Sequence, residues 1–340
     1  MKIDLVMDGV WGSAGKGGVA GWISKRTPYD TVVCAYGTQA GHTYNDRSRD
    51  LRMMVQQLPV GVSGPTVKTV MLGPGALIHA GTLQREIEQY MRGGQRLVIH
   101  EHAAVVRDDH AEREKSMGMT KIGSTTKGVG AAMVDRIMRD PDSKAVAKVG
   151  FKNHPLEQFV VDRFEYDRIL QESKHLLVEG AQGFGLSLYH GDWPYCTSRD
   201  VTPWQIAADC GLPFTWSQYI TIWMVMRTFP IRVNNRDGSS GPAYPGQKEI
   251  SWGDLGREPE LTTVTKLPRR IFEFSDEQFK HAMLHCASPM TKTVLTFADY
   301  CGEDALTDII RRIHRTGHSC DYLCFGPDDA DIREIDYADI

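Results

Sequence analysis

The sequence predicts an α/β fold with a mainly parallel central sheet, helices on both faces, a start resembling a phosphate-binding loop, and loop and small subdomain insertions. Two observations lead to this prediction. Short apolar segments rich in β-branched residues alternate with segments of helical periodicity, which is typical of parallel strands joined by helices. The first apolar segment also runs directly into a glycine-rich loop and then a helical pattern, as nucleotide-binding folds begin.

The elements are expected in the following order. The first strand covers residues 2–7, and the spacing of Val19, Trp22 and Ile23 then predicts a helix that stops at Thr27-Pro28. Further strands are predicted at residues 31–36, 67–72, 96–100, 176–179, 221–227, 293–297 and 322–325, with helices at 80–91 and 304–314. Residues 237–246, rich in Gly and Pro, predict a long loop. Because no repeat or low-complexity linker divides the chain, residues 1–340 are expected to form a single domain.

Composition narrows the functional class. The chain has 39 Lys+Arg against 43 Asp+Glu, a formal net charge of −4, which predicts no nucleic-acid or membrane partner. No apolar run approaches the roughly 20 residues that span a bilayer, and the first residues lack the layout of a signal peptide. The 7 scattered Cys indicate reduced thiols. We therefore expect a cytoplasmic enzyme.

The glycine-rich loop carries the first functional prediction. Gly12, Gly15, Gly17 and Gly18 let backbone amides approach phosphates, and Lys16 offsets their charge. The spacing differs from G-x-x-x-x-G-K-[ST], because a glycine stands where Ser or Thr would bind Mg²⁺. A glycine-rich turn without a ligand is the simpler alternative. The preceding strand and the embedded lysine favour a phosphate loop of a different type.

The loop resembles that of the adenylosuccinate synthetases, whose pattern is Q-W-G-D-E-G-K-G-K. Further stretches are similar to family motifs in the same order. They are residues 37–43 (G-H-N-A-G-H-T in the family), 122–130 (I-G-T-T-G-R-G-I-G), 179–183 with 194–198 (E-G-A-Q-G and P-Y-V-T-S), 263–265 with 269–270 (the aspartate loop), and 296–299 with 326–328 (the base-binding end).

This resemblance implies a two-step ligase reaction that needs Mg²⁺. The γ-phosphoryl of a nucleoside triphosphate goes to the 6-oxygen of a purine nucleotide, and the α-amine of L-aspartate then displaces phosphate. The implied catalytic residues are Ser13, His42, Lys16 and Gln182. The implied triphosphate-binding residues are Gly12, Ser13, Ala14, Gly15, Lys16, Gly17, Gly18, Gly41, His42, Thr43, Asp299, Gly326 and Pro327.

The resemblance also assigns the other ligands. The purine-monophosphate residues would be Ser13, Gln39, Ser124, Thr125, Arg139, Gln182 and Thr197. The aspartate residues would be Thr263, Val264, Thr265, Arg269 and Arg270, and the Mg²⁺ ligands Ser13 and Gly41. Arg139 would reach in from a second subunit, which implies a homodimer, because an arginine acting in trans cannot work in a monomer.

One departure from the family changes the expected substrate. The catalytic aspartate of the family is Ser13 here, and a neutral hydroxyl cannot act as a simple base. A shorter side chain leaves room for a 2-amino group beside N1 and C2 of the purine. The phage members of the family, the 2-aminoadenylosuccinate synthetases, resemble this sequence in the same way and convert dGMP. We therefore expect dGMP and L-aspartate as substrates, on the route to 2-aminoadenine DNA.

A second departure concerns the phosphoryl donor. Phe297 replaces the lysine of the family motif T-K-L-D, so the lysine that packs on guanine is lost and ATP or dATP could replace GTP. Two other functions stay open. They are ordinary adenylosuccinate synthesis from IMP with GTP, and a non-catalytic nucleotide-binding switch, which the loss of the aspartate would favour.

One cluster of possible metal ligands is judged structural. His314, His318, Cys320 and Cys324 lie close in the sequence, but their spacing is not one of the usual zinc arrangements.

Overall fold

A ten-stranded sheet forms the centre of the protein, whose computed structural model describes residues 1–235, 238–262 and 266–336. The strand order is β17-β16-β15-β11-β1-β10-β2-β5-β7-β9, and every neighbouring pair is parallel except β16 and β17. The strands are β1 (Lys2–Asp8), β2 (Thr31–Cys34), β5 (Thr69–Leu72), β7 (Arg96–His100), β9 (Val160–Val161), β10 (His175–Gly183), β11 (Ile220–Arg227), β15 (Thr291–Thr296), β16 (Tyr322–Cys324) and β17 (Ile332–Glu334).

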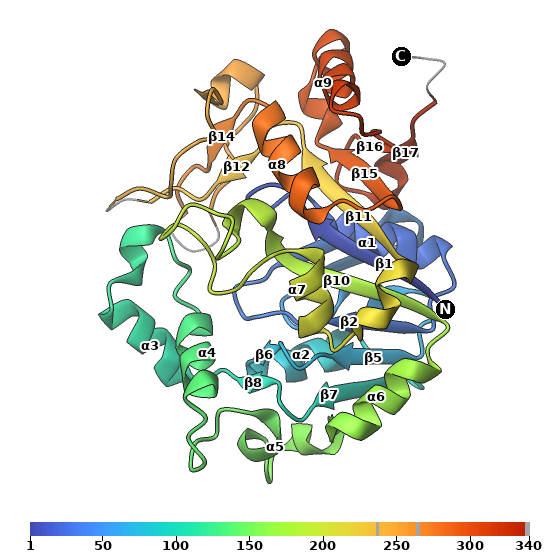
Figure 1. The fold of residues 1–340 in the computed structure, drawn as a ribbon, viewed down its shortest axis with the longest axis vertical. Coiled ribbons are helices and arrows are strands. Elements are labelled where there is room, and N and C mark those ends of the chain that lie inside the picture. Colours follow the sequence, from blue (N-terminus) through green and yellow to red (C-terminus); the bar gives the residue numbers. More distant parts are fainter. Residues whose placement is uncertain (236–237, 263–265, 337–340) are drawn as a thin grey trace.

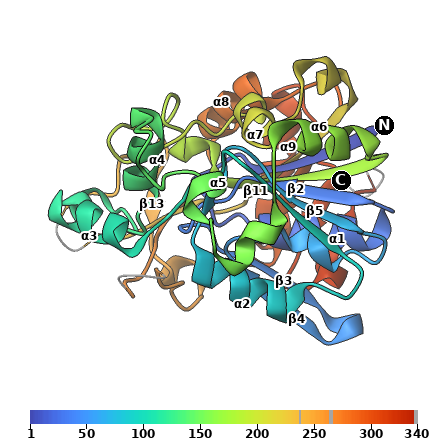
Figure 2. The same ribbon diagram turned by 90° about the horizontal axis from the view of Figure 1, so that it is seen from below.

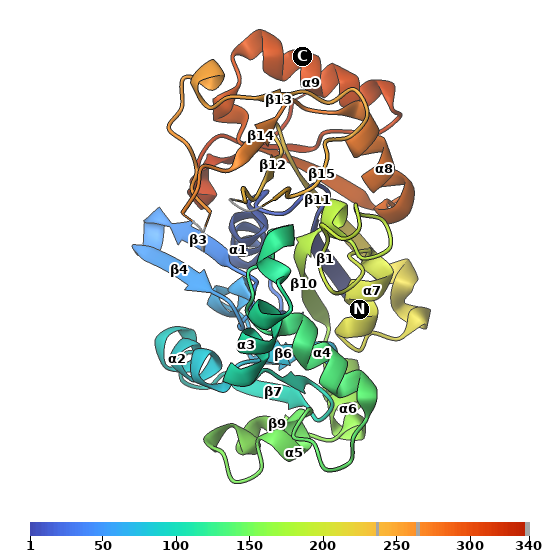
Figure 3. The same cartoon turned by 90° about the vertical axis from the view of Figure 1, so that its left-hand side faces the viewer.

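Helices cover both faces of this sheet (Figure 1). In Figure 3, α1 and α2 lie on one side of the strands, and α6, α7 and α8 lie on the other. Figure 2 shows α3 and α4 at the end of the molecule opposite the N-terminus. The helices are α1 (Lys16–Arg26), α2 (Ala80–Tyr90), α3 (Asp108–Ser116), α4 (Val129–Met138), α5 (Ala147–Gly150), α6 (Arg163–Glu172), α7 (Pro203–Asp209), α8 (Asp276–Cys286) and α9 (Glu303–Arg315).

Three smaller sheets are inserted around the central one. A hairpin joins β3 (His42–Asp46) to β4 (Leu51–Val55), and a short parallel pair joins β6 (Leu77–Ile78) to β8 (Ala104–Val105). An antiparallel sheet has the order β12-β14-β13, with β12 (Ile231–Arg232), β13 (Glu249–Ile250) and β14 (Arg270–Phe272). The predicted fold class, an α/β fold with a mainly parallel central sheet, helices on both faces and small insertions, is confirmed.

The core is built on the strands that the sequence marks as apolar. Residues 3–8 of β1 are all buried, as expected for a central parallel strand with helices on both faces. One hydrophobic cluster includes residues from Ile3 to Ile332. The expectation of a single domain stays a prediction, and this shared core supports it.

Each predicted strand is present, with ends that differ by a few residues. The expected helix 80–91 is Ala80–Tyr90, and the expected helix 304–314 is Glu303–Arg315. Within the predicted loop 237–246, the described residues 238–246 form neither helix nor strand; residue 237 lies outside the described residues. None of the helices in the described ranges is both apolar enough and long enough to cross a bilayer.

A glycine sets the distance between α1 and the β3 hairpin. A Cβ added at Gly17 would lie 2.6 Å from the backbone oxygen of Thr43, whereas one added at Gly18 would meet nothing within 4 Å. Helix α1 can therefore lie against β3 only where residue 17 lacks a side chain.

The two glycines provide a matched pair of variants. We predict that Gly17→Ala lowers the free energy of unfolding by about 1–3 kcal/mol, because the overpacked backbone must shift. Gly18→Ala should leave it unchanged or raise it by up to about 1 kcal/mol, because alanine favours a helix over glycine. Urea unfolding measures both, and equal effects of the two substitutions would contradict the close approach.

Candidate active site

The carboxylate of Asp8 organises the glycine loop. Asp8 is the last residue of β1 and is fully buried. One of its oxygens accepts hydrogen bonds from the amides of Val10 (2.9 Å) and Gly12 (3.3 Å). The other accepts from the amide of Ala14 (3.1 Å) and from Lys16 Nζ (3.3 Å). The loop therefore folds around an anion of its own chain, and that anion fixes the position of the Lys16 ammonium group.

A buried arginine orients the residue that departs from the family pattern. Ser13 has a left-handed backbone, with φ of 56°, and its carbonyl oxygen accepts a hydrogen bond from Arg227 Nη1 at 3.0 Å. Arg227 is completely buried, is paired with Glu260, and lies with its guanidinium carbon 3.5 Å from the ring centroid of Phe297. With its carbonyl held inside, Ser13 is left exposed at the rim of a cavity.

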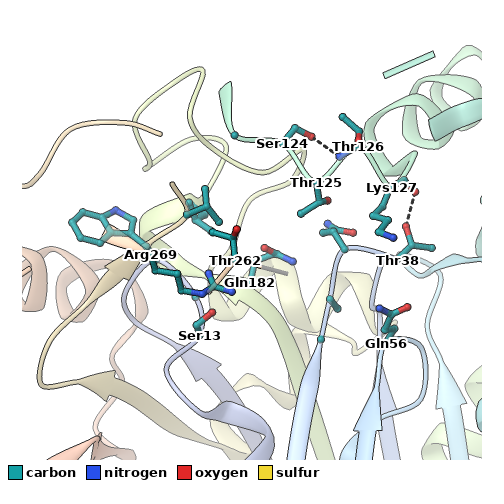
Figure 4. A pocket seen from close by; sticks show the side chains of 18 of the residues that line it. Ser13, Thr38, Gln56, Ser124, Thr125, Thr126, Lys127, Gln182, Thr262 and Arg269 are labelled. Atoms are coloured by element: carbon teal, nitrogen blue, oxygen red, sulfur yellow. Dashed lines mark hydrogen bonds between the residues drawn. The ribbon is translucent and has the colours of Figure 1, made fainter. Parts of the chain in front are cut away.

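This cavity, of about 610 Å³, brings together residues from motifs that are far apart in the sequence. Figure 4 shows Ser13, Gln182 and Arg269 on one side, facing Lys127 on the other. The predicted site residues that line it are Gly12, Ser13, Lys16, Gln39, Gly41, His42, Ser124, Thr125, Gln182 and Arg269. The glycine loop, the loop before β3, the segment before α4 and the end of β10 therefore meet at one place.

A smaller cavity of about 150 Å³ adjoins the first and shares part of its lining. It adds Thr197, whose amide donates to the carbonyl of Leu186 at 2.8 Å, and the buried Arg232. Of the predicted monophosphate residues, Arg139 lies apart. It is exposed at the C-terminal end of α4 and lines neither cavity.

A third cavity, of about 400 Å³, contacts the glycine loop from another side. Gly15 and Thr43 line it, whereas their neighbours Lys16 and His42 line the larger cavity. The predicted triphosphate residues that line the third cavity are Gly15, Gly18, Thr43, Asp299, Gly326 and Pro327. Ala14 and Gly17 are buried and line none of the three cavities.

The two predicted aspartate-binding arginines point in different directions. Arg269 lines the larger cavity, but Arg270 pairs with Glu249 at 2.6 Å and lies outside the cavity lining. Thr262 also lines the larger cavity and directly precedes the predicted aspartate loop. The loop residues themselves, Thr263, Val264 and Thr265, lie outside the described residues.

His42 is held as a neutral imidazole. It is only 6% exposed, and its ring stacks on that of Tyr36 with centroids 4.4 Å apart. Burial, and then the positive charge of Lys16, lower the pKa of His42 to about 3. Negative phosphate groups between the two side chains would offset the charge of Lys16, so the proton affinity of His42 depends on what occupies the cavity.

Charge in the larger cavity is one-sided. No carboxylate is present among the described residues that line it, whereas Lys16, Lys127 and Arg269 contribute cationic groups.

Sequence reasoning did not single out Lys127, Asp8 or Arg227. Lys127 could have been found, because it stands where the family motif has an arginine. No sequence pattern indicates a role for Arg227, because its contact with the glycine loop joins segments that are distant in the sequence.

The comparisons with known proteins find relatives that match most of this chain. The family model for adenylosuccinate synthetase matches residues 5–145 and 140–309. The N6-succino-2-amino-2'-deoxyadenylate synthase of Acinetobacter phage SH-Ab 15497 is 39% identical over 99% of this chain and 95% of the relative. The synthase of the same name from Vibrio phage phiVC8 is 40% identical over 98% of each chain.

Two solved structures are similar. The Cyanophage S-2L succinoaminodeoxyadenylate synthetase, bound to dGMP and to dATP as an energy donor, matches with a TM-score of 0.92 and 37% identity, over 98% of this chain and 95% of the other. The adenylosuccinate synthetase of Plasmodium falciparum matches with a TM-score of 0.81 and 18% identity, over 99% and 100%. The second likeness supports the fold alone.

The lowered pKa of His42 predicts a pH effect on stability. Between pH 6.5 and about 3 the unfolded chain binds a proton at this residue that the native chain does not bind, so stability falls as the pH falls. Replacing His42 by Gln removes this loss, which amounts to about 2 kcal/mol between pH 6.5 and about 5.

Urea unfolding at these two pH values measures the difference. His102→Gln, at a histidine that is 45% exposed, is the control. If His42→Gln and the control lose the same stability on acidification, His42 is not held neutral.

Proposed function

This chain belongs to the adenylosuccinate synthetase family, and we propose that it is the ligase that joins L-aspartate to C6 of dGMP. In the proposed reaction, dGMP, a nucleoside triphosphate and L-aspartate give 2-amino-2'-deoxy-N6-succinyladenylate, the nucleoside diphosphate and phosphate. The product serves the synthesis of 2-aminoadenine DNA. The observation that carries the proposal is Ser13, which takes the place of a family carboxylate in a cavity that keeps Lys16, His42 and Gln182.

The first step transfers the γ-phosphoryl group to O6 of the purine. The nucleoside of the donor would lie in the third cavity, and its phosphates would pass the glycine loop into the larger one, because neighbouring residues of the loop and of β3 line both. Lys16 and His42 are then next to the transferred group. Cationic and hydrogen-bonding groups fixed there before the reaction stabilise the charge that develops on it.

The 6-oxygen becomes a nucleophile when N1 of guanine loses its proton. The family aspartate that would take this proton is absent. Instead, Lys127 and Arg269 add positive charge to a cavity whose described lining holds no carboxylate, and this charge favours the deprotonated, anionic base. The charge of Lys16 is offset by Asp8 at 3.3 Å. The N1 proton leaves to solvent. The amide of Gln182 can hydrogen-bond the 6-position both before and after phosphorylation.

In the second step the α-amine of aspartate attacks C6. A C–N bond forms, the bond between C6 and the phosphorylated oxygen breaks, and phosphate leaves. Arg269, which faces the larger cavity, would hold a carboxylate of aspartate with its forked donors. Arg270 would support the loop through Glu249 instead of binding the substrate.

The donor atoms in the larger cavity fit Mg²⁺. Ser13 and Gly41 are both exposed there and offer a hydroxyl and a carbonyl oxygen, which suit a small hard cation that also binds phosphates and water. Asp8 does not fit this role, because its oxygens already accept hydrogen bonds from the loop and from Lys16. When bound, Mg²⁺ neutralises phosphate charge during the transfer.

The third cavity favours an adenine nucleotide as donor. Asp299, the residue expected to read guanine, pairs with Arg257 at 3.2 Å. A carboxylate engaged in this way has less capacity to accept hydrogen bonds from the N1–H and 2-amino groups of guanine. Adenine has neither of these donor groups. The similar cyanophage structure contains dATP as an energy donor. We propose ATP or dATP as the donor for this chain.

The active form would be a homodimer completed by Arg139. This residue follows α4, whose exposed face carries Val134 (51% exposed), Ile137 (64%) and Met138 (69%). Large apolar side chains gathered on one exposed helix favour contact with another protein surface. The partner subunit's Arg139 would then reach the 5'-phosphate of the monophosphate.

Substrate assays test the proposal directly. Initial rates of phosphate release are measured with aspartate and Mg²⁺, with IMP, GMP and dGMP crossed against ATP, dATP and GTP. Faster turnover of IMP than of dGMP would overturn the proposed specificity.

A change at residue 13 tests the role of the serine. We predict that Ser13→Asp lowers the ratio of kcat/KM for dGMP to that for IMP by about tenfold or more, because the longer carboxylate crowds the 2-amino group and supplies a base for IMP. Aspartate tolerates the left-handed backbone of this position. Ser13→Ala is the control and should keep the preference for dGMP. A rise in dGMP turnover with aspartate would show that steric relief is the wrong account.

Subunit mixing tests the dimer. We predict that mixing inactive Arg139→Ala subunits with inactive Lys16→Ala subunits restores activity, up to roughly a quarter of the wild-type value, because one site of each hybrid dimer is then intact. Activity is measured after subunit exchange is established by mass spectrometry. Exchange without any recovery would mean that Arg139 does not act in trans.

A further inference from the structure

Three histidines outside the cavities converge where α8 meets the segment that follows β10. His281 and His285 lie four residues apart on α8, so their side chains share one face of that helix. His190 lies in the loop between Leu186 and α7. One ring nitrogen from each histidine lies within 4.8 Å of the others. In the part of the chain that the structure describes, this is the one such group of potential metal-ligating side chains.

The rings of the three histidines are tilted or perpendicular to one another and do not form a parallel stack. The centroids of His190 and His285 are 4.2 Å apart, and the ring of His281 stands at 84° to that of His285 and at 75° to that of His190. The buried Phe184 contacts all of them, with its centroid 5.0 Å from that of His281. All three histidines are half-buried, so solvent and ions can reach them.

Polar groups behind the cluster resemble the outer partners of metal-binding histidines. The hydroxyl of Tyr244 lies 3.0 Å from Nδ1 of His281, which holds that ring in place and leaves its Nε2 available. The carboxylate of Asp200 lies 4.0 Å from Nε2 of His190 and is itself fixed by Thr202 Oγ1 at 2.8 Å. This carboxylate adds negative charge beside the place that a cation would occupy.

We propose that His190, His281 and His285 form a binding site for a divalent transition-metal ion of the zinc type. Imidazole nitrogens suit Zn²⁺, Co²⁺ and Ni²⁺, whereas Mg²⁺ prefers oxygen ligands. Three protein nitrogens leave a further coordination position for water. This site is separate from the Mg²⁺ site of the ligase reaction, since none of the three histidines lines a cavity described above.

The ion would link α8 to one wall of the monophosphate site. His190 lies in a loop that is closed by a hydrogen bond from the amide of Leu188 to the carbonyl of Arg199, at 3.0 Å. The same loop contains Thr197, which lines the smaller cavity. On the other side, Tyr244 packs on Trp11, which lines both adjoining cavities, with ring centroids 5.7 Å apart. The histidines are therefore positioning residues that do not touch the reacting atoms.

Metal titration of the full-length, tag-free protein tests this site. After chelation and with excess Mg²⁺ present, Co²⁺ should bind at one ion per chain with the visible absorption of low-coordinate cobalt, and Zn²⁺ should displace it. Tyr244→Phe should weaken binding by roughly 10–100-fold, the usual effect of losing an outer partner. His190→Ala and His285→Ala should weaken it further. His318→Ala, at a histidine that contacts α8 through Phe279, should bind as the wild type does.

Hydrogen exchange supplies a second readout, and the exchange pattern measured without metal also shows whether each variant is folded. Zn²⁺ should slow exchange of the amides of residues 187–199 in the wild type and in His318→Ala, and should leave them unchanged in His285→Ala. Wild-type Co²⁺ affinity in both His190→Ala and His285→Ala would overturn the proposal. So would a folded wild-type chain that neither binds Co²⁺ nor shows protection by Zn²⁺.

Discussion

The buried carboxylate of Asp8 is the constraint on which the rest of the site depends. A desolvated anion must be paired or hydrogen-bonded, and here the amides of the glycine loop and the ammonium group of Lys16 meet that requirement. Asp8 also pairs in register with Gly183 of β10 and with Val225 of β11. Because β1 lies between these two strands, the loop, Gln182 and Arg227 are brought together by the sheet itself.

The sequence predicts the fold better than it predicts the direction of single side chains. Strands such as β1 and β11 are rich in apolar and β-branched residues, which local composition reveals, whereas β9 has only two residues and shows no periodicity. The pair Arg269 and Arg270 shows the limit for the site. Successive residues of an extended chain point to opposite sides, so one arginine faces the cavity and the other faces Glu249.

The sequence alone could not predict charge states and orientations that depend on contacts between residues far apart in the chain. The motif around His42 indicates a functional residue, but its neutral state comes from burial and from Lys16, a residue of another element. In the same way, the position of the Ser13 carbonyl depends on Arg227, which is far away in the chain and is itself held by Glu260. Motif similarity identifies the residue type at a position, whereas the charge state and orientation arise from packing.

The loss of one carboxylate is consistent with the remaining charges of the cavity. Guanine carries a 2-amino group where hypoxanthine has a C–H. In the proposed site, the short side chain of Ser13 leaves room for that group, whereas the family's longer carboxylate would crowd it. In the proposed mechanism, the positive charges of Lys127 and Arg269, which line the cavity, favour an anionic purine without a fixed base. On this proposal, the replacement of aspartate by Ser13 removes a proton acceptor and makes room for the 2-amino group, and the cationic lining stabilises the anionic base in the first step.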